Sequence, residues 1–140
     1  MIDIENKVFS DVATLLRNKF EGISVYGEYI EAPSSFPCVT LVEDDNSTDT
    51  RFSTLTEIEE ITSVMFTANV YSNKANAKKS EAKAIAEAVS DMMASLGFRR
   101  SLMNPIPNVD RTIYRITMRF SAKVRKKVVD GNNVYTIYTD

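Results

Sequence analysis

The chain has 140 residues, of which 44% are hydrophobic and 26% charged, and it carries a formal net charge of −2. This length suits one globular domain that buries its own core, and the near-neutral charge argues against a general nucleic-acid-binding coat. No basic region followed by an apolar run marks a signal peptide, and no stretch approaches the roughly 18 apolar residues that span a bilayer. We therefore expect a cytosolic protein without a membrane partner.

The first predicted element is a helix over residues 3–20, because apolar side chains recur there every three or four positions. Strand-forming residues over 23–31 predict a strand. The next strand should cover 38–43 and begin directly after Pro37, because proline cannot donate to a strand ladder. Residues 44–56 are polar and show no periodicity, which predicts an exposed loop.

Alternating apolar and polar residues over 57–71 predict a long strand with one buried face. Helical spacing follows over 74–96, and Gly97 suits the left-handed position that ends a helix. Residues 98–103 predict a short strand, which the proline-rich segment 104–108 should close.

The last third of the chain predicts only strands. Residues 112–124 alternate again, and the turn residues 130–133 lie between two apolar runs that predict a β-hairpin. Neighbouring strands with only two helices predict an α+β fold, in which both helices pack on one face of a mainly antiparallel sheet. We expect one domain over residues 1–125 and a C-terminal hairpin extension over 126–140.

The sequence offers little for catalysis. It contains no histidine, the commonest general base and transition-metal ligand, and its four glycines form no phosphate-binding loop. Cys38, the only cysteine, is predicted to be a small buried side chain. The acidic run 43–49 lacks the central glycine and the closing glutamate of a helix–loop–helix calcium site. We therefore expect no enzyme activity, no cofactor and no metal site.

A row of cations on the strand 112–124 and its flanks is the most informative surface feature. Its members alternate with apolar residues and are Arg111, Arg115, Arg119, Lys123 and Arg125. Two interpretations are open. Glu57 and Glu59 could form ion pairs with the row if the two long strands pair, or the row could face a neighbouring subunit or a polyanion.

The C-terminal hairpin is rich in apolar and aromatic residues for a two-stranded ribbon, which is marginal in water. These residues are Val128, Val134, Tyr135, Ile137 and Tyr138. The hairpin should therefore either pack on its own domain or dock on a partner, for example by exchange between the subunits of a ring.

Several short segments follow one another in a recognisable order. They are the N-terminal helix, the strand from Phe36 to Leu41, the segment from Tyr71 to Lys74 before the second helix, its stop from Leu96 to Phe98, the loop from Pro105 to Asn108, and Ile113 to Arg115. In this order they resemble the small tail terminator or tail-completion proteins of long-tailed, siphovirus-type bacteriophages. The resemblance covers most of residues 1–125 and contains no catalytic motif.

The resemblance implies a structural virion protein at the head–tail junction, made in the cytoplasm of the bacterial host. Such proteins form a ring, commonly a hexamer, that caps the tail tube, stops its polymerisation and docks the head-closure or connector protein. Genome DNA passes through the lumen without sequence-specific binding. The implied partners are therefore copies of the chain itself, the tail tube protein and the connector.

Two sets of residues are assigned to this expected role. The predicted subunit-interface residues are Glu57, Glu59, Arg115, Arg119 and Lys123. The predicted loop that reaches the next ring contains Thr48, Asp49, Thr50, Arg51 and Phe52. The alternative functions are a head-closure or adaptor ring in the same junction and, with less support from the net charge, a small nucleic-acid-binding module.

Overall fold

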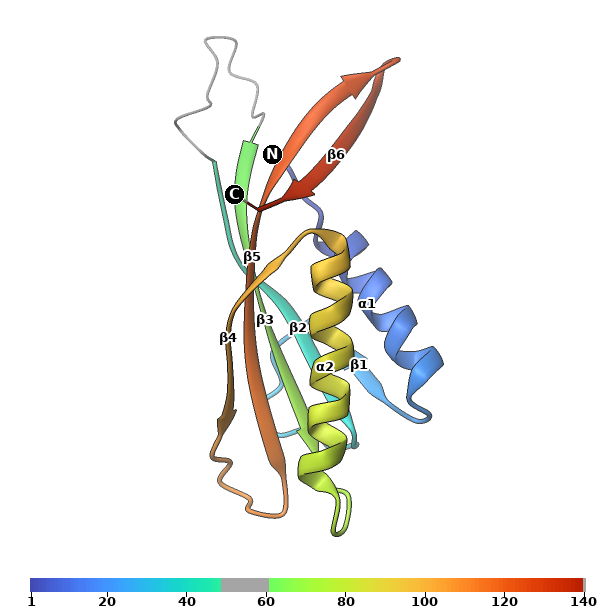
Figure 1. Cartoon of the computed structure of the whole chain (residues 1–140), viewed down its shortest axis with the longest axis vertical. Coiled ribbons are helices and arrows are strands. Elements are labelled where there is room, and N and C mark those ends of the chain that lie inside the picture. Colours follow the sequence, from blue (N-terminus) through green and yellow to red (C-terminus); the bar gives the residue numbers. More distant parts are fainter. Residues whose placement is uncertain (49–60, 140) are drawn as a thin grey trace.

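The structure is a computed structural model, and it describes residues 1–48 and 61–139. The elements in chain order are α1 (Glu5–Lys19), β1 (Ser24–Tyr26), β2 (Cys38–Thr48), β3 (Ile61–Ser72), α2 (Lys78–Leu96), β4 (Arg99–Ile106), β5 (Tyr114–Val129) and β6 (Asn132–Tyr138). The described residues form two helices and one six-stranded, mainly antiparallel sheet, which confirms the predicted α+β fold (Figure 1).

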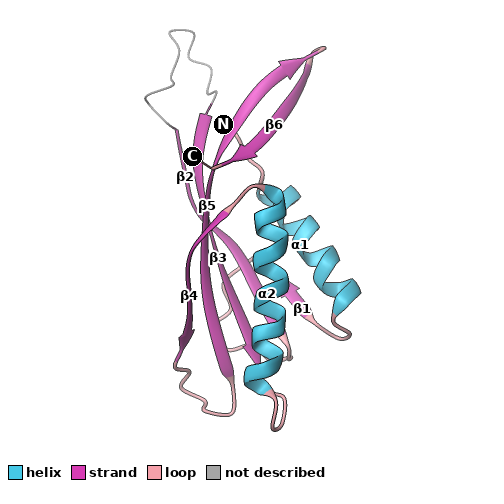
Figure 2. Ribbon diagram, viewed as in Figure 1, coloured by secondary structure: helices cyan, strands magenta, loops and turns pink. Residues whose placement is uncertain are grey.

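The strands follow the order β1-β2-β3-β5-β4, and β6 pairs with β5 outside this path. Only β1 and β2 are parallel, and the other pairs are antiparallel. The 16-residue β5 has two successive partners along one of its edges. Residues 115–121 pair with β4, and residues 123–129 pair with β6. Figure 2 shows the β5–β6 hairpin extending beyond the part of the sheet that the helices cover.

Both helices pack on one face of the sheet and bury a single core (Figure 1). The alternation of β3 sets this face, because Val64, Phe66, Ala68 and Val70 point toward the helices and are all buried. Phe66 meets Phe98 edge to face, with 5.3 Å between ring centroids. The side chains that the helices contribute are Val8, Val12 and Leu16 from α1 and Ile85, Val89 and Met93 from α2.

Several predicted boundaries were wrong. Residues 44–48 do not belong to a loop, because β2 continues through them and pairs with Thr62–Met65 of β3 after a bulge between Glu43 and Asp45. The backbone ladder needs no apolar side chains where one face is open, so polarity alone misplaced this boundary. The strand predicted over 23–31 covers only Ser24–Tyr26. The second helix begins at Lys78, because Asn76 has a φ of 62° that a right-handed helix cannot contain.

The segment 104–106 also belongs to a strand, since β4 extends to Ile106. Pro105 is tolerated because β4 lies at the edge of the sheet, where its missing N–H breaks no ladder. Two turn predictions are confirmed. Gly97 ends α2 with a φ of 107°, and the β5–β6 turn has positive φ at both Asp130 and Gly131.

Candidate interaction surfaces

The face of the sheet that points away from the helices is called the open face here. It carries the odd-numbered side chains of β5, among them Arg115, Arg119, Lys123 and Arg125, opposite the buried Ile116, Met118, Phe120 and Val124. Arg111 lies in the turn before β5. The alternation therefore places four of the five predicted cations on one face, as the sequence predicted.

Arg115 is held inside the molecule. Its Nε and Nη2 donate to Oδ1 of Asn69 at 3.1 and 3.0 Å, and its guanidinium carbon lies 5.5 Å from the centre of the Tyr71 ring. The hydroxyl of Thr117 donates to the same Asn69 oxygen at 2.6 Å. One acceptor thus fixes two neighbouring side chains of β5, and Arg115 is an internal support more than a free contact residue.

The part of the open face around Asn69 and Tyr71 is buried, although neither of the described helices packs on it. The Tyr71 hydroxyl donates to the carbonyl oxygen of Ile30 at 3.5 Å. The segment between β1 and β2 therefore crosses behind the sheet (Figure 1). Burial raises the pKa of Tyr71, with Arg115 acting in the opposite direction. Cys38, opposite Tyr71, is buried too, and burial raises the pKa of its thiol to about 11.

Arg119 differs from Arg115 because it is exposed. It lies between Thr67 of β3 and Leu102 of β4 in the strand register. The hydroxyl of Thr67 donates a hydrogen bond to the carboxylate of Asp44. In the residues that the structure describes, no carboxylate lies within ion-pair distance of Arg119. Of the two arginines among the predicted contact residues, Arg119 is thus the one whose side chain is exposed.

Lys123 lines a hollow of about 260 Å³ higher on the open face. The hollow also contains Asp45, Arg99 and Ser121, so charges of both signs meet there. Thr48 ends β2 as an exposed residue opposite Thr62. Glu57, Glu59, Asp49, Thr50, Arg51 and Phe52 lie outside the described residues. Their predicted contacts remain predictions.

A second hollow, called the edge hollow here, lies beside the edge strand β1. Its volume is about 440 Å³, and its lining residues are Glu5, Asn6, Phe9, Tyr26, Gly27, Glu28 and Ile30. The ring of Phe9 approaches Gly27 within ordinary van der Waals range of where a side chain would begin. The lining of the edge hollow therefore combines apolar side chains from α1, from β1 and from the segment after β1 with two carboxylates.

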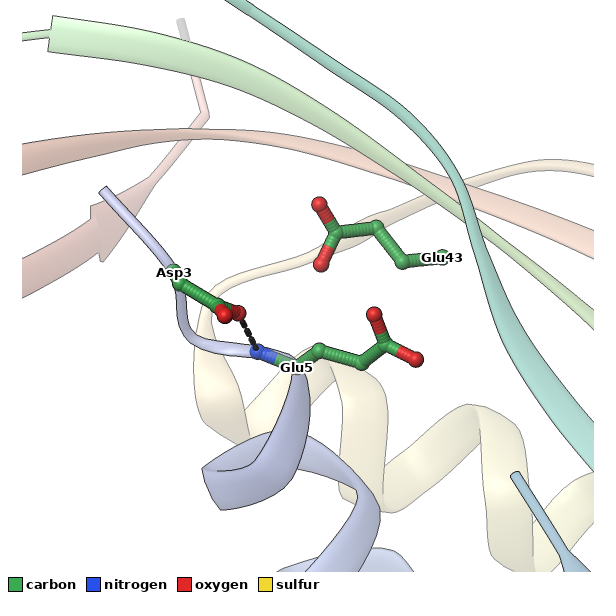
Figure 3. Close-up of side chains that lie close together, drawn as sticks. All are labelled: Asp3, Glu5 and Glu43. Carbon is green, nitrogen blue, oxygen red and sulfur yellow. Dashed lines mark hydrogen bonds between the residues drawn. The ribbon is translucent and has the colours of Figure 1, made fainter. Parts of the chain in front are cut away.

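Three carboxylates meet next to the edge hollow, at the start of α1. Figure 3 shows Asp3, Glu5 and Glu43 pointing toward one another, with Asp3 accepting a 3.1 Å hydrogen bond from the backbone N–H of Glu5. Burial raises the pKa of Glu43, and the charges of Glu5 and Asp3 raise it further. The positive end of the α1 dipole offsets part of this repulsion.

The β5–β6 hairpin is a third exposed surface. Val128, Val129, Val134 and Tyr135 are exposed by 65, 48, 45 and 38%. The base of the hairpin is anchored, because Ile137 is partly buried against the core and a Cβ atom on Gly97 would lie only 2.4 Å from the Ile137 carbonyl oxygen. The hairpin therefore packs on its own domain at the base and exposes apolar side chains at the tip.

The edge hollow and the cluster of Asp3, Glu5 and Glu43 were not predicted from the sequence. One signal was present, because Glu43 has the same strand parity as the buried Val39 and Leu41 and so had to face the helix layer. The contacts of Glu43 with Asp3 and Glu5 were not visible, since they depend on how α1 crosses the sheet. In the described part of the chain, neither helix has the length and apolar character that a bilayer crossing requires.

Comparison with known proteins gives one informative result. No protein-family model and no curated protein matches the sequence. Among solved structures, the fold is similar to that of a chain in the virion of a native gene transfer agent particle, with a TM-score of 0.57 and 21% sequence identity. The match covers 86% of this chain and 91% of that chain. The two chains share a fold over nearly their whole lengths.

Proposed function

We propose that this chain is a structural protein of a phage-type virion, and that it forms a ring that ends the tail tube at the head–tail junction. The observation that carries the proposal is the fold shared with a virion chain over 86% of this sequence. A match of almost full length on both sides favours a similar single building block over a domain borrowed by a larger protein.

The exposed surfaces support assembly as the mode of action. A ring subunit needs two different contact surfaces, and this molecule offers sheet edges, an exposed hairpin tip and the charged open face. The ring would act sterically, because it covers the growing end of the tube and offers no equivalent surface for the next tube subunit. This mechanism assigns no catalytic group, cofactor or metal.

Within this function we assign Arg119 and Lys123 to subunit contacts. Glu57 and Glu59 are likewise proposed to contact the neighbouring subunit. Residues Thr48 to Phe52 are proposed to reach the next ring. Arg115 contributes indirectly, since its bonds to Asn69 hold the strand that presents Arg119. Genome DNA would pass through the ring without base-specific contacts.

The decisive experiment mixes the purified protein with growing tail tubes assembled from a purified tail tube protein of the same virion. A terminator binds tube ends and arrests elongation, which electron microscopy measures as a shorter length distribution with a ring at one end. A head-closure or adaptor protein, the alternative within the same junction, leaves tube length unchanged and binds only tubes that are already capped. Tubes that elongate normally without bound protein would contradict the terminator role, and a protein that also fails to bind capped tubes would contradict both functions.

Arg119 offers a sharper test of the contact surface. We expect Arg119→Glu to leave the fold intact, because the side chain is exposed, and to reduce the mass of the assembled ring in native mass spectrometry. The matched control is Lys83→Glu on the exposed side of α2. An unchanged oligomer mass for Arg119→Glu would remove this residue from the interface.

A further inference from the structure

The tip of the hairpin, residues 126–135, places exposed apolar side chains next to lysines. In the strand register Lys126 pairs with Tyr135, and Lys127 pairs with Val134. These successive pairs lie on opposite faces of the ribbon, so each face presents an apolar side chain next to a lysine. Val128 and Val129 extend the apolar surface toward the turn.

No contact in the described part of the chain covers this tip. β3 pairs with β5 only as far as Arg125, opposite Ile61, and the described partner of residues 126–129 is β6 alone. A two-stranded ribbon is only marginally stable in water unless a third strand or a helix packs against it. Within residues 1–48 and 61–139, the outer edge of β6 has no strand partner, which favours addition to another strand edge.

The edge hollow has the complementary properties. Phe9, Tyr26 and Ile30 supply apolar surface, and Glu5 and Glu28 supply negative charge. The nearby Asp3 and Glu43 add to the negative potential on the same side. β1 forms the end of the sheet order, so among the residues that the structure describes its outer backbone is a second free strand edge.

We propose that the hairpin tip of one copy docks in the edge hollow of a second copy of this chain. Tyr135 packs on the apolar residues of the hollow, and Lys126, on the same face of the ribbon, approaches Glu5 and Glu28. Donor and acceptor are different surfaces, so the contact runs head to tail and generates a ring when the rotation closes. This inference rests on the proposed function and names the contact that would build the ring.

Cysteine cross-linking tests the contact directly, because the only native cysteine is buried and can be replaced by Cys38→Ser. In that background, Tyr135→Cys in one preparation and Glu28→Cys in another are mixed under mild oxidation. We expect a disulfide-linked heterodimer from the mixture, and a ladder of larger species from the double variant Tyr135→Cys/Glu28→Cys. The matched control pairs Tyr135→Cys with Lys83→Cys on α2 and should give only background cross-linking.

Charge exchange gives an independent measurement. Lys127→Glu, on the opposite face of the ribbon, is the matched control, and the variant Lys126→Glu should weaken self-association about tenfold in sedimentation experiments. Glu5→Lys/Glu28→Lys in the second copy should restore association with that variant, and a general loss of stability would not be restored in this way.

The outcomes separate the inference from the proposed function. Native oligomers without the Tyr135–Glu28 cross-link would overturn the docking contact and leave the ring in place. Efficient cross-linking of Tyr135→Cys with itself would replace the edge hollow by a second hairpin as the acceptor, and so overturn the proposal. A chain that stays monomeric at every concentration would contradict the docking contact, whereas the arrest of tube growth would still test the terminator role.

Discussion

β5 passes through two regions that stabilise the same strand differently. In the body of the sheet its even-numbered side chains are buried under the helices, and β3 and β4 pair with it on both edges. In the hairpin its described partner is β6 alone, and Val128 and Val129 are exposed. The body is stabilised by its own core, whereas in the described residues the tip has only the pairing of β5 with β6.

Truncating the core should give the largest effect. Phe66→Ala removes a fully buried ring that packs against Phe98, so we expect a loss of about 3–5 kcal/mol in the free energy of unfolding. Chemical denaturation of dilute protein measures this loss. Val129→Ala in the hairpin should change the same quantity by less than about 0.5 kcal/mol, since the side chain is half exposed. Similar losses for the two variants would remove the distinction between the regions.

The junction between body and hairpin should be the next most sensitive position. Gly97→Ala needs a left-handed alanine, and its Cβ atom would meet the backbone carbonyl of Ile137. We expect a loss of about 2–4 kcal/mol and faster hydrogen exchange of the β6 amides. Gly22→Ala is the matched control, because Gly22 has a φ of 76° but no heavy atom within 4 Å of the added carbon. It should lose only the conformational part, about 1–2 kcal/mol. Equal losses would show that the hairpin does not press on Gly97.

On the open face, substitutions of Asn69 and of Arg119 should differ in their effect on the free energy of unfolding. Asn69→Ala removes the acceptor for Arg115 and Thr117 and leaves partly buried donors without a partner, so we expect a loss of about 1–3 kcal/mol. Arg119→Ala should stay within about 0.5 kcal/mol of the wild type, because its side chain is exposed. Thermal unfolding of both variants checks the contrast. A larger loss for Arg119→Ala would mean that Arg119 is the internal support.

The carboxylates beside the edge hollow should give the smallest effect, one that depends on pH. The pKa of Glu43 is raised above its ordinary value of 4.5, so the folded state binds more protons than the unfolded state between the two pKa values. The free energy of unfolding should fall as the pH rises through this window. Glu43→Gln lacks this loss, so it should be more stable than the wild type at neutral pH.

Denaturation curves at several pH values measure this difference. The difference between Glu43→Gln and the wild type should shrink as the pH falls below the ordinary pKa of Glu43, where this side chain is uncharged in both the folded and the unfolded state. A difference that stays constant with pH would show that packing, and not charge, sets the effect of Glu43→Gln.

The periodicity of the sequence predicted most of the fold. The alternation of β3 and β5 and the spacing of α1 and α2 correctly identified the core between the sheet and the helices, because burial of one face produces that pattern directly. Gly97 was also predicted, since its left-handed backbone restricts the residue type.

The surfaces were predicted less well, for a physical reason. The alternation placed Arg115 and Arg119 on one face, but only the cross-strand position of Asn69 makes the first an internal support. The edge hollow joins residues of α1 with the segment after β1, and the path of that segment has no periodic signal. Such contacts depend on tertiary packing, which composition and spacing do not record.

The uninterrupted course of β5 restricts how this protein can change over time. Side chains alternate strictly along a strand, so inserting or deleting one residue near position 126 would turn every later side chain to the other side. Substitutions at the tip can alter which partner it fits while the helix-covered half stays intact. A length change of two residues keeps the odd or even spacing between Phe120 and the turn, whereas a change of one residue keeps the same faces only with a bulge like that between Glu43 and Asp45.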